Sequence, residues 1–129
     1  MDNRLYVVIP CYNEEEVLPE TARRLKEKMN ALISSGKIAS DSRVALVNDG
    51  SRDKTWEIIT GLHSEDKLFS GINLSRNRGH QNALLAGLMT VMDRADMVIS
   101  MDADLQDDIN AMDEMIEKYL SGCDVVYGV

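Results

Sequence analysis

Two aspartates separated by one residue, Asp102 and Asp104, follow an apolar run at 97–101. Side chains alternate along a strand, so residues two apart face the same side where the chain leaves a sheet. Two carboxylates on one side suit a hard divalent cation such as Mg²⁺ or Mn²⁺, and Gln106 would add a neutral oxygen. An isolated Asp-x-Asp is more often a solvated acidic loop. The apolar run before it is what favours a metal site here.

A further carboxylate, Asp49, follows another apolar run in the sequence 48–51. Asn-Asp-Gly is ordinary turn chemistry, with Gly50 supplying a positive φ. A hairpin is not expected, because a helical pattern at 53–62 follows rather than a second alternating strand. Asp49 is therefore predicted to point from a strand end into a cleft. A carboxylate there could accept hydrogen bonds from a nucleobase or a ribose.

Polar residues also follow the first apolar run. Tyr12 could stack on a flat ring or pack beneath the first helix, and Glu14 could bind a ligand or complement the helix N-terminus. The segment 77–79 precedes a helix and could bind an anion through backbone N–H groups or only cap the helix. Arg76, just before this segment, and Arg78, within it, form the only tight basic pair near the predicted cleft.

The elements that must position these residues alternate along the chain. Most of the short apolar runs are too uniformly apolar to have one solvent-exposed face, which is typical of parallel strands that are covered on both faces. The predicted strands are Leu5–Ile9, Arg43–Val47, Gly71–Leu74, Met97–Met101 and Asp124–Tyr127. The order predicts an α/β fold with a Rossmann-like, mostly parallel sheet flanked by helices. In such sheets ligands bind at the carboxyl ends of the strands, near a switch in strand order.

Four helical patterns lie between these runs. The first carries an apolar stripe from Val17 to Ile33, with Asn13 predicted as its N-cap and Glu16 as the carboxylate that reaches back. The second carries Trp56, Ile59 and Leu62, and the third is predicted to bury its apolar residues between 83 and 91. The fourth is predicted to begin at Asp107 or Asp108, to end at Gly122, and to bury Met112, Met115, Ile116 and Leu120.

Composition excludes several classes of protein. A chain of 129 residues suits a single domain. Its net charge of −8 argues against binding to nucleic acid, which requires a basic surface. The most apolar stretch, 83–92, is far shorter than the ~20 residues of a membrane span. The N-terminus lacks the pattern of a signal peptide, and the two cysteines are too far apart to suggest a disulfide framework or a zinc site. We therefore expect a cytoplasmic domain.

Taken together, three segments resemble the N-terminal, nucleotide-sugar-binding half of a family 2 glycosyltransferase with the GT-A fold. The segment 7–15 resembles the opening strand and loop of the family, 46–53 its Asp-Asp-Gly-Ser motif, and 101–107 its metal motif. The resemblance covers essentially all of 1–129. Three further segments resemble the polyprenyl-phosphate branch, which includes dolichyl-phosphate mannose synthases and bactoprenol glucosyltransferases: 74–79, 83–87 and 124–129.

The resemblance implies a metal-dependent inverting transfer of a sugar from a UDP- or GDP-sugar to an acceptor, with polyprenyl phosphate as the expected acceptor. The residues that match nucleotide-sugar-binding positions are Pro10, Tyr12, Glu14, Val47, Asp49, Asp102, Ala103 and Asp104. Asp102, Asp104 and Gln106 match the ligands of Mg²⁺ or Mn²⁺, and the same two aspartates match the catalytic positions.

The sequence departs from the family pattern at a few places. Asn48 replaces the first aspartate of the Asp-Asp pair, and Asp108 stands where proline is common. The family continues past Val129 with an acceptor-binding half that supplies the catalytic base, so we expect a chain truncated before that half. Donor binding is expected to survive in it and transfer is not. Association with the cytoplasmic face of a membrane is expected only through sequence absent here.

Other functions stay open at this point. The chain could be a nucleotide-sugar-binding fragment without turnover, and turnover with added lipid phosphate separates this from the enzyme. It could also come from a transferase that acts on a cell-surface polysaccharide or another glycan. A more distant alternative is a haloacid-dehalogenase-type phosphatase, which would use Asp102 and Asp104 as nucleophile and acid/base. That family expects its motif near the start of the fold and a later lysine, which 124–129 does not contain.

Overall fold

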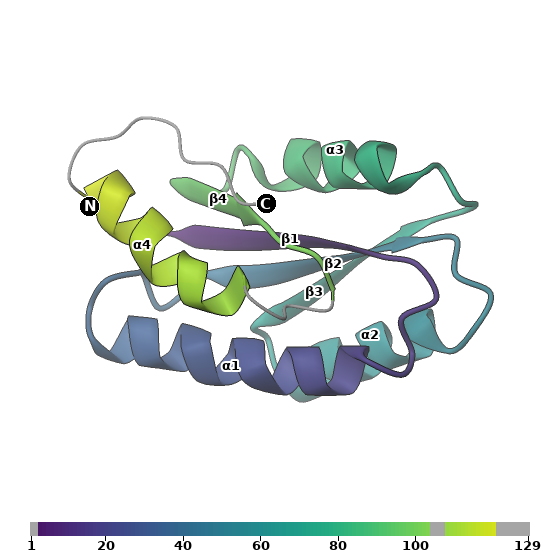
Figure 1. Cartoon of the computed structure of the whole chain (residues 1–129), viewed down its shortest axis with the longest axis horizontal. Coiled ribbons are helices and arrows are strands. Elements are labelled where there is room, and N and C mark those ends of the chain that lie inside the picture. Colours follow the sequence, from purple (N-terminus) through teal and green to yellow (C-terminus); the bar gives the residue numbers. More distant parts are fainter. Residues whose placement is uncertain (1–2, 104–107, 121–129) are drawn as a thin grey trace.

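The computed structural model describes residues 3–103 and 108–120. Its sheet has four strands in the order β3-β2-β1-β4, and every neighbouring pair is parallel. The strands are β1 (Leu5–Cys11), β2 (Arg43–Asp49), β3 (Phe69–Leu74) and β4 (Met97–Ser100). The helices are α1 (Leu18–Ser34), α2 (Thr55–Glu65), α3 (His80–Val91) and α4 (Asp108–Leu120). The predicted α/β fold with a parallel sheet flanked by helices is confirmed (Figure 1).

The strand order reverses beside β1. The chain first moves outward from β1 to β2 and β3, and it then returns to the other side of β1 to form β4. The loops that follow β1 and β4 therefore leave neighbouring strands, and they lead to α1 and α4, which pack on the same face of the sheet. A crevice at the carboxyl ends of such strands is the usual ligand site of an open α/β sheet.

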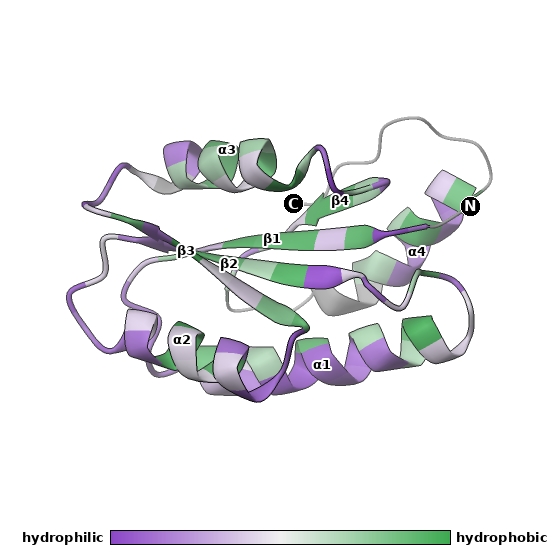
Figure 2. Ribbon diagram, turned by 180° about the vertical axis from the view of Figure 1, so that it is seen from behind, coloured by the Kyte–Doolittle hydropathy of each residue, from purple (hydrophilic) through white to green (hydrophobic). Residues whose placement is uncertain are grey.

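Helices cover both faces of the sheet. Alternate residues of β1 face opposite sides: Leu5, Val7 and Ile9 belong to the core shared with α1, α2 and α4, while Tyr6 and Val8 pack towards α3. Figure 1 shows α3 on one side of the sheet and the other helices on the other. Figure 2 shows apolar residues along β1 and β2, and hydrophilic ones along much of α1. Burial on both faces explains why the strand sequences are so uniformly apolar.

The third helix lies unusually close to the sheet at Gly87. A Cβ atom at this position would lie 2.5 Å from Cγ1 of Val8 and 2.9 Å from Cγ2 of Val47. Gly87→Ala is therefore expected to lower the free energy of unfolding by about 1–3 kcal/mol, because the packed valines must move. The measurement is urea unfolding. Gly61→Ala in α2 is the matched control, since a Cβ there meets nothing within 4 Å, and it is expected to raise stability by up to about 1 kcal/mol. Equal effects of the two substitutions would contradict the prediction.

Several details differ from the sequence-based expectation. Helix α1 begins at Leu18 with Pro19 in its first turn, and its N-cap is Val17, so the prediction of Asn13 as the cap was wrong. Proline suits the first turn of a helix because its missing N–H would be unsatisfied there anyway. Leu120, predicted to be buried, is 42% exposed at the end of α4. The predicted strand at 124–127 and the predicted helix end at Gly122 lie outside the described residues.

No helix within 3–103 and 108–120 is both long and apolar enough to cross a membrane.

Candidate functional site

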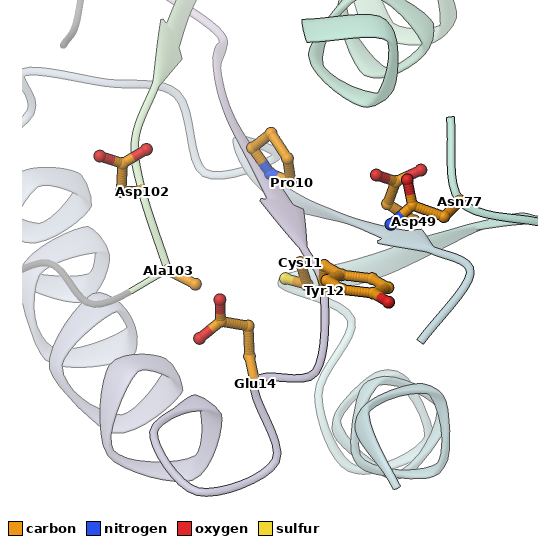
Figure 3. Close-up of a pocket in the computed structure, with 8 residues that line it drawn as sticks. All are labelled: Pro10, Cys11, Tyr12, Glu14, Asp49, Asn77, Asp102 and Ala103. Carbon is orange, nitrogen blue, oxygen red and sulfur yellow. The ribbon is translucent and has the colours of Figure 1, made fainter. Parts of the chain in front are cut away.

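A pocket of about 430 Å³ opens at the carboxyl end of β1, where the strand order reverses. Its walls come from the ends of β1, β2 and β4 and from the loop after β3. The lining residues are Pro10, Cys11, Tyr12, Glu14, Asp49, Asn77, Asp102 and Ala103. Figure 3 shows that Asp49 and Asn77 lie on one side of the β1 end, and Asp102 and Ala103 on the other. The pocket therefore has two acidic ends separated by the end of β1.

The pocket can form because β1 and β4 separate at Pro10. Just before the two strands part, the N–H of Met101 donates a hydrogen bond of 3.1 Å to Val8 O. Pro10 comes two residues after Val8, so its backbone faces the same neighbour. Proline has no N–H to continue the ladder. The ladder to β4 therefore stops at the site while β1 stays paired with β2 as far as Cys11 and Asn48.

The loop that carries Tyr12 and Glu14 is held by the loop after β2. Asn13 has a φ of 52°, a left-handed conformation that is uncommon for residues other than glycine. Its backbone N–H donates to Ser51 Oγ at 3.0 Å, and its side-chain Oδ1 accepts from the N–H of Arg52 at 2.8 Å. The N–H of Glu14 donates to Thr55 Oγ1 at 2.8 Å. These bonds explain why Asn13 does not cap α1: its side chain is engaged 39 residues away.

Asp53 also holds the loop after β1. We call the three residues that hold this loop, Ser51, Asp53 and Thr55, the clamp. The Oδ2 atom of Asp53 accepts from the N–H of Glu15 at 3.2 Å, and its Oδ1 accepts from Thr55 N and Oγ1 at 2.9 and 2.5 Å. Burial alone would raise the pKa of Asp53, but these hydrogen bonds to the charged form outweigh it and hold the pKa below its ordinary value.

The depressed pKa of Asp53 predicts how the clamp responds to acid. A group whose pKa is lowered on folding stabilises the folded state above its unfolded pKa, and that contribution is lost as the pH falls below about 4 towards the folded value. Asp53→Asn is expected to lower the free energy of unfolding by about 1–2 kcal/mol at pH 7, and by less at pH 3. The measurement is urea unfolding at both values. Glu57→Gln on the exposed side of α2 removes the same charge as a control. A deficit of the same size at both pH values would contradict the prediction.

On the other side of β2, Asp49 and Gly50 are locked to the loop after β3. Asp49 is 3% exposed, and its Oδ1 accepts a hydrogen bond of 2.6 Å from the N–H of Arg78. Gly50 has a φ of +68° and lies directly against the backbone of Arg76 and Asn77. Asn77 in turn accepts from the N–H of Gly79 at 3.0 Å. This bond closes a turn just before α3, whose N-cap residue Gly79 makes no side-chain cap hydrogen bond. The two interpretations of 77–79 therefore both stay predictions.

Asn48, the departure from the family's Asp-Asp pair, has partners suited to an amide. It is buried, its Nδ2 donates to Oδ1 of Asn73 at 2.8 Å, and its Oδ1 accepts from the N–H of Ser51 at 3.2 Å. An amide both donates and accepts, which a carboxylate does not. Asn48 thus ties β3 to the turn that begins the clamp.

Cys11 lines the pocket although sequence reasoning did not place it there. Burial, aided by the charge of Glu14, raises the pKa of its thiol to about 12. Cys11 is therefore a neutral thiol near neutral pH, and it does not provide a thiolate nucleophile. The signal that could have found it was its place between Pro10 and Tyr12 at a strand end.

The structure brings most of the predicted nucleotide-sugar residues together in this pocket. Those that line it are Pro10, Tyr12, Glu14, Asp49, Asp102 and Ala103. Val47 is an exception, since its side chain is fully buried beneath α3 and faces Gly87. Asp104 and Gln106 lie outside the described residues. Asn77, which the sequence indicated as part of a segment that binds an anion or caps a helix, is an additional lining residue.

The donor chemistry of the pocket fits a hard cation. Its charged groups are carboxylates, and Mg²⁺ usually takes only one or two of these from protein, with phosphate and water oxygens completing the shell. Asp102 is the described member of the predicted ligand set. Within the described residues, no three His, Cys, Asp or Glu side chains gather as a metal site.

Residues 6–129 match the sequence profile of Glycosyl transferase family 2. The chain belongs to this family. It is 49% identical over 125 residues to the uncharacterized glycosyltransferase YkoT of Bacillus subtilis, covering 97% of this chain and 37% of that protein. It is 35% identical over 126 residues to the bactoprenol glucosyl transferase of Shigella phage SfX, covering 95% of this chain and 38% of the other.

Solved structures of S. aureus TarS share the fold of this chain. The crystal structure of S. aureus TarS 1-349 superimposes with a TM-score of 0.65 at 18% identity, over 91% of this chain and 33% of TarS. The complex of the same protein with UDP-GlcNAc gives a TM-score of 0.64 at 19% identity, over 91% of this chain and 32% of that one. At such identities the likeness concerns the fold alone. The chain spans a little over a third of the length of the curated relatives YkoT and the phage SfX transferase.

Proposed function

We propose that residues 1–129 form the nucleotide-sugar-binding part of a GT-A glycosyltransferase that transfers a sugar from a UDP- or GDP-sugar to polyprenyl phosphate with inversion. One observation carries the proposal. The pocket at the strand-order switch holds Asp49 on one side of β1 and Asp102 on the other. This arrangement suits an elongated ligand with hydrogen-bond donors at one end and a diphosphate at the other.

The Asp49 side is assigned to the nucleoside. The Oδ1 atom of Asp49 is oriented by the N–H of Arg78, so its carboxylate is fixed where it can accept from a base N–H or a ribose hydroxyl. Tyr12 is 41% exposed and presents a ring on which a base can stack. Glu14 lies further along the pocket towards Ala103 (Figure 3).

The Asp102 side is assigned to the diphosphate. Asp102, together with Asp104 and Gln106, would hold Mg²⁺ or Mn²⁺. When bound, the cation supplies neutralisation of the charge that develops on the leaving diphosphate. The residues of this chain orient the donor and hold its diphosphate at the end of β4. The base that activates the acceptor is assigned to sequence outside 1–129.

Polyprenyl phosphate is the proposed acceptor because several relatives are named bactoprenol glucosyl transferases. A phosphate is already ionised near neutral pH, so it demands less of a general base than a hydroxyl does. The second candidate is a nucleotide-sugar-binding unit without turnover of its own. It is favoured by the observation that the chain spans just over a third of its relatives. The phosphatase alternative is set aside, since the chain belongs to family 2.

Calorimetric titration with UDP-glucose and GDP-mannose, each with and without Mn²⁺, tests the donor site. We expect one of the two to bind, and to bind more tightly with Mn²⁺. A folded chain that binds neither donor nor its free nucleotide would contradict the proposal. Incubation of the donor that binds with a short-chain polyprenyl phosphate then separates the two candidates: product indicates the enzyme, and binding without product indicates the binding unit.

A further inference from the structure

The segment that carries Asp102 is anchored by a residue of the first helix. Thr21 lies in the first turn of α1 and is 3% exposed, and its hydroxyl donates a hydrogen bond to the carbonyl oxygen of Ala103, 82 residues away in the sequence. Ala103 is itself buried. The contact joins the helix that follows the Tyr12–Glu14 loop to the segment that follows β4.

This contact fixes the chain on one side of Asp102, and the sheet fixes it on the other. The N–H of Met101 donates to Val8 O in β1, and the carbonyl of Ala103 accepts from Thr21. Asp102 therefore stands between two anchored backbone groups, and it lines the pocket. Because Ala103 directly follows Asp102, the orientation of its carbonyl constrains the backbone that carries Asp102.

The hydroxyl of Thr21 forgoes the usual local partner of a helical threonine. Threonine in a helix often bonds the carbonyl four residues earlier, which here is Val17 O. That carbonyl accepts the ordinary helical hydrogen bond from the backbone N–H of Thr21 at 3.0 Å, while the hydroxyl bonds Ala103 O. The side chain is left to satisfy a buried carbonyl of a distant segment, which would otherwise be desolvated without a partner.

We propose that Thr21 is a positioning residue for the diphosphate and metal end of the pocket, acting through Ala103 and not by contact with the ligand. This inference rests on the proposed function. The nucleoside end is positioned separately, by the clamp and by the contact of Asp49 with Arg78. The two ends of the pocket are therefore held by different hydrogen bonds, and removal of the Thr21 hydroxyl is expected to affect the diphosphate end.

Thr21→Val tests the inference, because valine keeps the shape of threonine and loses the hydroxyl. Calorimetry measures two affinities for each protein. The first is for the nucleoside of the preferred donor, uridine or guanosine. The second is for the corresponding nucleoside diphosphate, with and without Mn²⁺. We expect Thr21→Val to reduce the gain in diphosphate affinity due to Mn²⁺ by about 10-fold, the lower end of the effect of removing an outer-shell partner of a metal ligand, because Thr21 bonds the residue next to the proposed ligand Asp102. Nucleoside affinity is expected to stay at the wild-type value.

Matched variants separate positioning from general damage. Thr21→Ser keeps the hydroxyl and is expected to restore the Mn²⁺-dependent gain. Thr60→Val removes an exposed hydroxyl that bonds Glu57 O within α2, and it is expected to change neither affinity. If Thr21→Val does not fold, Thr21→Ala takes its place. It is expected to lower the Mn²⁺-dependent gain in diphosphate affinity and to leave nucleoside affinity unchanged.

Each outcome is decisive. An unchanged Mn²⁺-dependent gain in the folded variant overturns the inference. So does a parallel fall of nucleoside and diphosphate affinities, which would show a structural role alone. A wild-type chain that binds nucleoside and diphosphate with no effect of Mn²⁺ overturns the inference but leaves a nucleotide site in place. A wild-type chain that binds no nucleotide overturns the proposed function itself.

Discussion

Asp102→Asn is expected to abolish most of the Mn²⁺-dependent affinity for nucleoside diphosphate while leaving nucleoside affinity intact. The substitution keeps the size of the side chain and removes the charge that a hard cation selects. Loss of an outer-shell partner already costs roughly 10- to 100-fold in metal affinity, so loss of a proposed ligand is expected to cost at least about 100-fold. Calorimetry with and without Mn²⁺ measures the effect.

Asp93→Asn is the control for Asp102→Asn. Asp93 is exposed between α3 and β4, away from the pocket, and its substitution changes the net charge by the same amount. We expect it to bind as the wild type does. If both variants lost Mn²⁺-dependent affinity equally, the effect would reflect overall charge, and the assignment of Asp102 would fail.

Gly50→Ala is expected to destabilise the chain more than either Gly87→Ala or Asp53→Asn. A Cβ at position 50 would lie 2.2 Å from the backbone nitrogen of Asn77 and 2.5 Å from the carbonyl carbon of Arg76. Backbone atoms cannot rotate away as a side chain can, so the two loops must separate. Left-handed strain of about 1–2 kcal/mol adds to overpacking of about 1–3 kcal/mol, which gives an expected loss of about 2–5 kcal/mol. Nucleotide affinity is expected to fall as well, because Asp49 is its neighbour.

Gly36→Ala separates the two contributions to the effect at Gly50. Gly36 also has a positive φ, +78°, but a Cβ there meets nothing within 4 Å. Urea unfolding of both variants should therefore show a loss of about 1–2 kcal/mol for Gly36→Ala and a clearly greater loss for Gly50→Ala. A loss at Gly50 no greater than that at Gly36 would show that the loops are not in close contact.

The fold could be predicted from the sequence because its signals are local. The runs that became β1 and β2 are apolar on both faces, and the structure covers both faces with helices. The predicted stripe from Val17 to Ile33 follows helical spacing and is buried from Leu18 to Leu32, whereas Val17 at its start is 38% exposed. Most of the pocket could be predicted for a related reason, since the carboxyl ends of parallel strands meet at one edge of the sheet.

What could not be predicted depends on partners that are distant in the sequence. Asn13 has the local signature of a cap, yet its side chain bonds the N–H of Arg52. The partner of Asn48 is Asn73 on β3, and nothing in the neighbourhood of either residue indicates the pair. Val47 occupies a family binding position in the sequence, but strand alternation turns its side chain towards α3. These outcomes follow from strand register and loop packing, which a pattern of residue types does not encode.

The strand order also has a consequence for how the chain folds. Every neighbouring pair of strands is parallel, so each pairing needs a crossover, and the pocket joins residues as far apart as Pro10 and Ala103. Such high contact order slows folding, because the entropy of loop closure is lost before the non-local contacts form and stabilise the chain. The complete pocket exists only once β4 has docked beside β1. A nucleotide that occupies the pocket therefore binds only the native chain. At a concentration about 100 times its Kd it raises global stability by about 2.7 kcal/mol, so thermal melting in the presence of nucleotides reports binding directly.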